Sequence, residues 1–108
     1  MGKEKAEKII EGIKRFRKES SKEFGIEKVI VFGSLVSGKI GKDSDIDLIL
    51  VSKRFKGKKF FKRAIGLHKY WKLDYPVDFL CFTPEEFSEK GKQVSIISQA
   101  IKEGMELA

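Results

Sequence analysis

The sequence predicts a small α/β or α+β domain, with helices packed on a three-stranded mixed sheet in the order α-β-α-β-α-β-α-α. Three apolar runs have strand length, at Glu27–Phe32, Asp45–Ser52 and Pro76–Phe82. The first two are joined by a short connection, which favours antiparallel pairing. The longer connection to the third run allows a right-handed crossover and parallel pairing. At 108 residues the chain suits one domain, residues 1–108.

Residues 3–24 should form an amphipathic helix, because their apolar side chains recur at helical spacing with charges between them. Gly25 is well placed to end this helix. The apolar positions are Ala6, Ile9, Ile10, Ile13, Phe16 and Phe24.

Two further helical segments are expected between the strands. Ser34–Lys39 should be a short helical turn, and a loop then leads into the second strand. Lys58–Leu73 should be a helix whose core-facing positions are Phe61, Ala64, Ile65 and Trp71. The aromatic residues of this segment could instead serve a partner interface.

The third strand is followed by a capping box, in which Thr83 is the N-cap, Pro84 the first helical residue and Glu86 the third. A short helix should run to about Lys90. A last helix, with Val94, Ile97, Ala100 and Ile101 on its apolar face, should end near Gly104.

Composition limits where the protein works. Apolar runs are far shorter than the roughly 18 residues of a membrane span, and the N-terminus does not read as a signal peptide. The single cysteine, Cys81, fits a reducing compartment, so a cytoplasmic protein without membrane association is expected. Abundant lysine and glutamate, no asparagine and two glutamines are typical of a thermophile.

The net charge of +7 arises from one segment. Between Leu48 and Leu73 there are nine basic residues and no acidic ones, whereas the rest of the chain is nearly balanced. Such a segment, and Lys53–Arg63 in particular, could bind nucleic acid or an acidic partner. The alternative is a solvated lysine-rich surface.

Two carboxylates open the otherwise apolar second strand. Side chains alternate along a strand, so Asp45 and Asp47 lie on one face, about 6–7 Å apart at Cα. Buried like charges this close raise each other's pKa unless a cation neutralises them, and a divalent metal is the natural partner. A parallel third strand would bring Asp78 to the same end of the sheet, beside the Gly33-Ser34 turn that ends the first strand.

This pattern resembles the signature of the DNA polymerase β-like nucleotidyltransferase superfamily. Gly33-Ser34 is followed after three residues by Gly38, and after five more by Ser44-Asp45-Ile46-Asp47-Leu48. A later isolated aspartate, Asp78, lies in an apolar strand. The short length resembles the minimal nucleotidyltransferases, many of them antitoxins encoded beside HEPN toxins.

The resemblance implies a nucleotidyltransferase fold and a role for each matching residue. Asp45, Asp47 and Asp78 would be catalytic and would hold Mg²⁺, with two ions expected and Mn²⁺ possible. The nucleotide, ATP or another nucleoside triphosphate, would be bound by Gly33, Ser34, Gly38 and Ser44. The reaction implied is transfer of a nucleoside monophosphate, AMP in the first instance, to a hydroxyl group of a HEPN-type protein partner.

One departure from the family pattern affects the expected activity. Relatives often carry arginines in the turn after Gly33-Ser34, where this chain has Leu35, Val36 and Ser37. Lys39, Lys42 or the lysines of 53–59 could replace them. Two other functions therefore stay open: a non-catalytic antitoxin that binds its partner, and a nucleic-acid-binding accessory that uses the basic segment.

Several residues have simpler readings. The aspartate pair at 45 and 47 could cap backbone amides, Asp78 could be a surface residue, and Gly33 could serve a plain turn. His68 is better explained as a packed or surface histidine than as a catalyst, and Cys81 as a small core residue.

Overall fold

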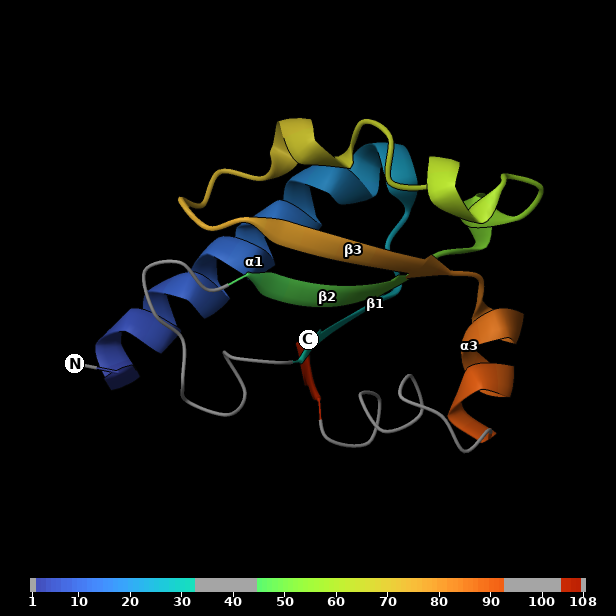
Figure 1. Cartoon of the computed structure of the whole chain (residues 1–108). Helices are drawn as coiled ribbons and strands as arrows, with labels where there is room; N and C mark the ends of the chain where they lie inside the picture. The colour runs from blue at the N-terminus through green and yellow to red at the C-terminus, as the bar shows by residue number, and fades with distance from the viewer. Residues whose placement is uncertain (1, 33–44, 93–103, 108) are drawn as a thin grey trace.

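The computed structural model describes residues 2–32, 45–92 and 104–107. Their strands form one four-stranded sheet in the order β3-β2-β1-β4. Figure 1 shows helix α1 and the turns of residues 53–70 on one side of this sheet, with helix α3 beside one end of it. The chain is therefore a mixed α/β structure, as predicted, with one more strand than expected.

Helix α1, Gly2–Phe24, packs its apolar stripe against the sheet. Ile13 and Phe16 are buried completely or almost so, and the predicted stop is confirmed, because Gly25 adopts a left-handed φ of 58°. Gly12 does not break the helix. An added Cβ there would lie 2.5 Å from the Leu73 side chain, so the glycine admits a close approach of that residue.

The three predicted strands are present with nearly the predicted bounds: β1 is Lys28–Phe32, β2 is Ile46–Val51 and β3 is Val77–Phe82. Strand β2 is antiparallel to β1 and parallel to β3, which confirms both predicted directions. A fourth strand, β4 at Met105–Leu107, pairs antiparallel with β1 and was not predicted.

Both faces of the sheet are covered by apolar residues. Toward α1, the larger cluster contains Leu48 and Leu50 of β2; on the other face, a smaller cluster contains Ile49 and Val51, with Phe87 of α3 packed on it. Strands buried on both sides read as continuous apolar runs, which explains the composition of β1 and β2.

The prediction of a helix over Lys58–Leu73 is wrong. The segment forms 3₁₀ turns instead: η1 at Lys53–Phe55, η2 at Phe60–Lys62 and η3 at Leu67–Tyr70. Gly66 has a φ of 91°, a left-handed conformation that interrupts a right-handed helix at this point.

The core positions assigned to that helix are consequently wrong in part. Phe61 is 74% exposed and Ile65 is 70% exposed, so both point to solvent rather than to the core. Ala64 and Trp71 do pack against the larger cluster, and the Trp71 and Phe16 rings form a T-shaped pair with a centroid distance of 5.5 Å.

Helix α3, Pro84–Lys92, begins with the predicted capping box. The Thr83 N–H donates to Glu86 Oε1 at 2.9 Å, and the Glu86 N–H donates to Thr83 Oγ1 at 3.2 Å. The expected helical turn at 34–39 and the expected helix from residue 94 fall on residues 33–44 and 93–103, outside the described residues.

Candidate active site at the β2–β3 end

Asp47 lies directly opposite Asp78 in the parallel pairing of β2 and β3. Neighbouring strands are about 4.8 Å apart, and residues in register project to the same face. Here that face is the one carrying Ile49, because residues two positions apart share a face. The sequence prediction that these two carboxylates meet is confirmed by this register.

Asp45 precedes β2 by one residue and completes a group that we call the acidic site: Asp45, Asp47 and Asp78. Asp45 and Asp78 are exposed, and only Asp47 is half-buried. The expectation of buried like charges therefore applies to Asp47 alone. Burial, followed by the negative charges of Asp78 and Asp45, raises the pKa of Asp47 above its usual value.

The electrostatics of the acidic site suit a cation. All three causes of the raised Asp47 pKa disfavour its charged form, and no basic side chain of the described residues offsets them. Among the described ranges, no group of three His, Cys, Asp or Glu side chains is assembled to hold a metal ion. A magnesium ion needs fewer than three such side chains, since it commonly uses one or two carboxylates together with waters and substrate phosphates. The Asp47–Asp78 pair with Asp45 nearby fits that donor set.

Strand β1 ends beside the acidic site, because its last residue, Phe32, pairs with Asp47. The four predicted nucleotide-binding residues follow Phe32 in the sequence. Gly33, Ser34, Gly38 and Ser44 all lie outside the described residues, and so do Lys39 and Lys42.

The lysines of 53–59 lie at the other end of the sheet, so they do not replace the missing arginines. Turn η1 begins two residues after β2 ends, whereas Asp47 is the second residue of that strand. At about 3.3 Å per residue, Asp47 and Lys53 are about 20 Å apart along the strand direction.

Two arginines of the basic segment are occupied by structural contacts. Arg54 Nη1 donates to the carbonyl oxygens of Lys22 at 3.1 Å and Glu23 at 2.8 Å, which fixes the end of α1. Arg63 is 6% exposed, and its guanidinium donates to the Lys58 and Cys81 carbonyls, each at 3.1 Å. That Lys53–Arg63 binds a polyanion or an acidic partner stays a prediction; of these two arginines, Arg54 is exposed and Arg63 is buried.

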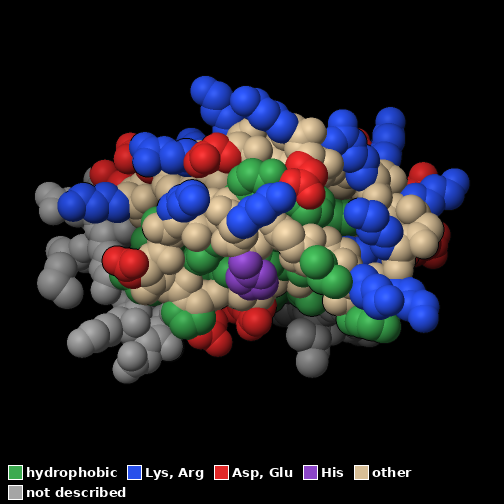
Figure 2. Space-filling model, turned by 90° about the horizontal axis from the view of Figure 1, so that it is seen from above, with side chains coloured by type: hydrophobic (Ala, Val, Ile, Leu, Met, Phe, Trp, Pro, Cys, Tyr) green, Lys and Arg blue, Asp and Glu red, His purple; other side chains and the backbone are tan. Residues whose placement is uncertain are grey.

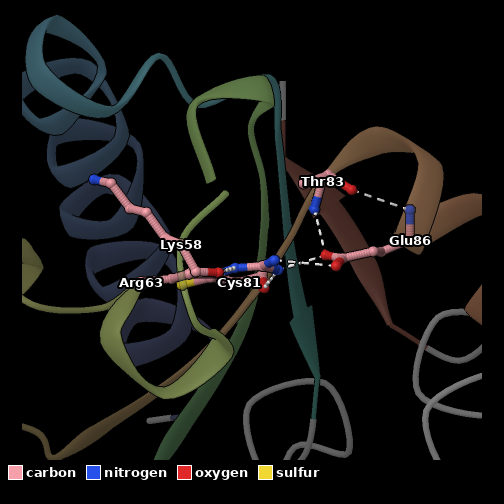
Figure 3. Close-up of polar contacts among 5 residues, drawn as sticks. All are labelled: Lys58, Arg63, Cys81, Thr83 and Glu86. Carbon is pink, nitrogen blue, oxygen red and sulfur yellow. Dashed lines mark hydrogen bonds and ion pairs between the residues drawn. The ribbon is translucent and has the colours of Figure 1, made fainter. Parts of the chain in front are cut away.

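Arg63 also pairs with Glu86, in a contact that the sequence did not reveal. Figure 3 shows the Arg63 guanidinium between the Lys58–Cys81 side and Glu86 of the capping box. The second contact joins Arg63 Nη2 to Glu86 Oε2 at 3.0 Å. This ion pair lowers the pKa of Glu86 and raises that of Arg63. One carboxylate thus caps α3 and neutralises a buried cation.

His68 and Cys81, which were weighed as functional residues in the sequence, are not part of the acidic site. His68 is exposed and lies edge-on to Phe79 at a centroid distance of 5.0 Å, on the face away from Asp78. Cys81 is 2% exposed, and burial raises the pKa of its thiol to about 12. These environments agree with the predictions of a packed or surface histidine and a small core cysteine.

The fold and the carboxylate pair together define an α/β protein with an acidic site at one end of a mixed sheet. The chain belongs to the nucleotidyltransferase domain family, which it matches over residues 13–105. It is also similar to a crystal structure of a candidate nucleotidyltransferase from Sulfolobus solfataricus, with 25% identity and a TM-score of 0.65. That likeness covers 82% of this chain and 78% of the other. No curated protein matches the chain.

Family membership carries general consequences. Nucleotidyltransferase domains transfer nucleotidyl groups from a nucleoside triphosphate and generally use divalent metal ions.

Among the helices of the described residues, none is both long and apolar enough to cross a membrane.

Proposed function

We propose that the protein transfers a nucleoside monophosphate, AMP from ATP, to a hydroxyl group with release of pyrophosphate, and that Mg²⁺ is held at the acidic site. The observation that carries this proposal is the register of Asp47 against Asp78, with Asp45 close enough to raise the pKa of Asp47. A carboxylate group without compensating basic residues among its described neighbours is a reasonable metal site.

Each residue has a proposed role. Asp45 and Asp47 would bind Mg²⁺, and Asp78 would complete the site and accept the proton of the acceptor hydroxyl. When bound, one or two Mg²⁺ ions supply charge stabilisation for the attacking and leaving oxygens at phosphorus. Gly33, Ser34, Gly38 and Ser44 would bind the triphosphate, as the family pattern implies.

We propose further that the acceptor hydroxyl is on a HEPN-type partner protein, which would make this chain an antitoxin. Support comes from Gly33-Ser34 and Ser44-Asp45-Ile46-Asp47-Leu48, which resemble the signature of the superfamily that includes the minimal nucleotidyltransferases. A reading frame for a small helical protein beside this gene would strengthen the proposal, and co-expression of the two proteins would give the assay its acceptor.

The test is a thermal melt with and without 5 mM MgCl₂ and a non-hydrolysable ATP analogue, followed by transfer of radiolabelled AMP to the co-expressed partner. A ligand that binds only the native state raises the melting temperature as its concentration passes Kd. The wild type should show this rise only with both ligands, whereas the double variant Asp45→Asn/Asp47→Asn should lose it. Asp78→Asn should lose AMP transfer.

Glu89→Gln is the matched control, since it removes one exposed carboxylate from α3, at the other end of β3. It should keep both the shift and the transfer. An undiminished shift in the double variant would refute the assignment of the acidic site.

The non-catalytic antitoxin remains the second candidate, because Leu35 and Ser37 stand where relatives often have arginine. It would be favoured if the wild type binds its partner stably and shows neither a Mg²⁺–nucleotide shift nor AMP transfer.

A further inference from the structure

Three large apolar side chains are exposed among the described residues, and all three lie within one short segment. Phe60 is 48% exposed, Phe61 74% and Ile65 70%. Single exposed apolar residues are ordinary, but their concentration at one place is typical of an interaction surface. Sequence periodicity assigned Phe61 and Ile65 to the core, with a partner interface as the alternative for the aromatic residues, and the structure shows both side chains exposed.

The same segment is strongly basic. Lys56, Lys58, Lys59 and Lys62 are exposed beside these residues, and no acidic residue occurs between Leu48 and Leu73. In Figure 2, blue lysine and arginine side chains gather around green apolar ones at the end of the molecule that carries η1 and η2. We call Phe60, Phe61 and Ile65 with these four lysines the apolar-basic surface.

The surface is hollowed and rests on a fixed base. A hollow of about 430 Å³ is lined by Gly57, Lys58, Lys59, Lys62 and Ile65. In the same segment, Arg63 donates hydrogen bonds to β3 and α3, and the centroids of the Phe60 and Phe82 rings are 5.6 Å apart. Phe61 and Ile65 are therefore presented from a segment that is anchored to the sheet.

We infer that the apolar-basic surface docks an acidic segment of a partner protein, with an apolar side chain of that segment in the hollow. Exposed apolar side chains would form the centre of the interface and the lysines its charged rim, which is the usual arrangement of protein interfaces. Rim lysines select for carboxylates opposite them and raise the rate of encounter.

Other occupants fit the surface less well. A second copy bound through the same surface would place lysines against lysines, because a two-fold interface is self-complementary. A single-stranded nucleic acid would need aromatic rings free for stacking. Only the exposed Phe61 offers such a ring, because Phe60 has Arg63 over its ring at 5.6 Å and Ile65 is not aromatic.

This inference does not depend on nucleotidyl transfer, since the surface lies at the opposite end of β2 from the acidic site. It can be tested with a fluorescein-labelled 18-residue peptide that carries leucines on one helical face and glutamates on the other. Binding is measured by fluorescence anisotropy at 150 mM NaCl. A control peptide has serine in place of every leucine.

The wild type should bind the leucine peptide at least tenfold more tightly than the serine peptide. Phe61→Ser/Ile65→Ser should lose at least tenfold in affinity with an unchanged melting temperature, because both side chains are mostly exposed. Lys59→Glu/Lys62→Glu should lose a similar factor. Its matched control, Lys8→Glu/Lys14→Glu, makes the same charge change on exposed positions of α1 and should lose less than threefold.

Asp47→Asn/Asp78→Asn should bind the peptide as the wild type does, which separates this result from any failure of the proposed function. Equal affinity of the two peptides, or wild-type affinity of the Phe61/Ile65 variant, would overturn the inference. So would binding of a 20-nucleotide oligo-dT, or of vesicles with one-quarter phosphatidylserine, that depends on Phe61 and Ile65 while peptide binding does not.

Discussion

Asp47 and Asp78 occupy the same register position on two parallel neighbouring strands, and the half-buried Asp47 has a raised pKa as a result of its burial and of this neighbour. The carboxylate pair therefore lowers the free energy of unfolding at any pH at which both groups are charged. A bound divalent cation would remove that cost, so the metal-free and metal-bound proteins should depend differently on pH.

Asp47→Asn should raise the melting temperature of the metal-free protein at pH 7. The folded state holds the Asp47 proton more tightly than the unfolded state, so wild-type stability falls as pH rises from the unfolded to the folded pKa. Well below the unfolded pKa of 3.8, at about pH 2, Asp47 is neutral in both states and the advantage of the variant should vanish. Thermal melts in EDTA at both pH values measure this, with Glu89→Gln as the control.

Excess Mg²⁺ together with the non-hydrolysable ATP analogue should reverse the ranking at pH 7, because only the wild type has the complete acidic site. A variant that melts no higher than the wild type in EDTA at pH 7 would show that Asp47 is held in its charged form by contacts of its own.

Glu86→Gln should destabilise the fold by about 1–2 kcal/mol. The amide oxygen can still accept the Thr83 N–H, but the buried Arg63 loses its charged partner, and bonds to charged groups contribute about 1.5–3 kcal/mol. The lower end applies because the Glu86 side chain is 41% exposed. Urea unfolding at pH 7 measures the change.

Asp47 and Glu86 should change the stability of the fold in opposite directions as the pH falls. The folded-state pKa of Glu86 is lowered, so its stabilisation is present above the unfolded pKa and is lost as pH falls through the folded value. The difference between wild type and Glu86→Gln should therefore shrink on acidification. Thr83→Ala removes only the hydroxyl of the cap. It should lower the free energy of unfolding by about 1 kcal/mol both at pH 7 and at acidic pH.

Gly25→Ala should destabilise the protein by about 1–2 kcal/mol, because residue 25 has a φ of 58° and a Cβ there would lie 2.9 Å from Arg54 Nε. Gly57→Ala is the matched control. Its φ is 83°, but nothing lies within 4 Å of the added Cβ, so only the backbone cost applies. Equal losses in urea unfolding would mean that Arg54 moves aside without cost.

Native Cys81 should resist thiol reagents. With a pKa of about 12, about 1 in 10⁴ of its thiols is ionised at pH 8, against about one in four for an ordinary cysteine. Reaction with Ellman's reagent should be at least 10³-fold slower than in 6 M guanidinium chloride. Rapid labelling of the native protein would mean that β3 opens readily at Cys81.

The parts of the fold that follow from the sequence are those fixed by periodicity and connection length. Helix α1 and the pairing of β1, β2 and β3 were predicted, because alternation and loop length leave few other arrangements. The meeting of Asp47 and Asp78 followed from the same argument.

The parts that escaped prediction have local causes. Phe61 and Ile65 are four residues apart, which is helical spacing, but the left-handed Gly66 and the 3₁₀ turns place both outside. Strand β4 is three residues long and too short to show alternation. The Arg63–Glu86 pair joins residues 23 positions apart, a contact that no local pattern encodes.

Strand β4 has a consequence for how the chain folds during its synthesis. Val29 of β1 pairs with Leu107, and Arg17 Nη1 of α1 reaches the Leu107 carbonyl at 2.7 Å across 90 residues of sequence. During synthesis this side of β1 therefore has no partner until residues 105–107 leave the ribosome. An unpaired edge invites association with other chains. Pairing of β4 with β1 should therefore be a slow step of folding, because it joins segments far apart in the sequence.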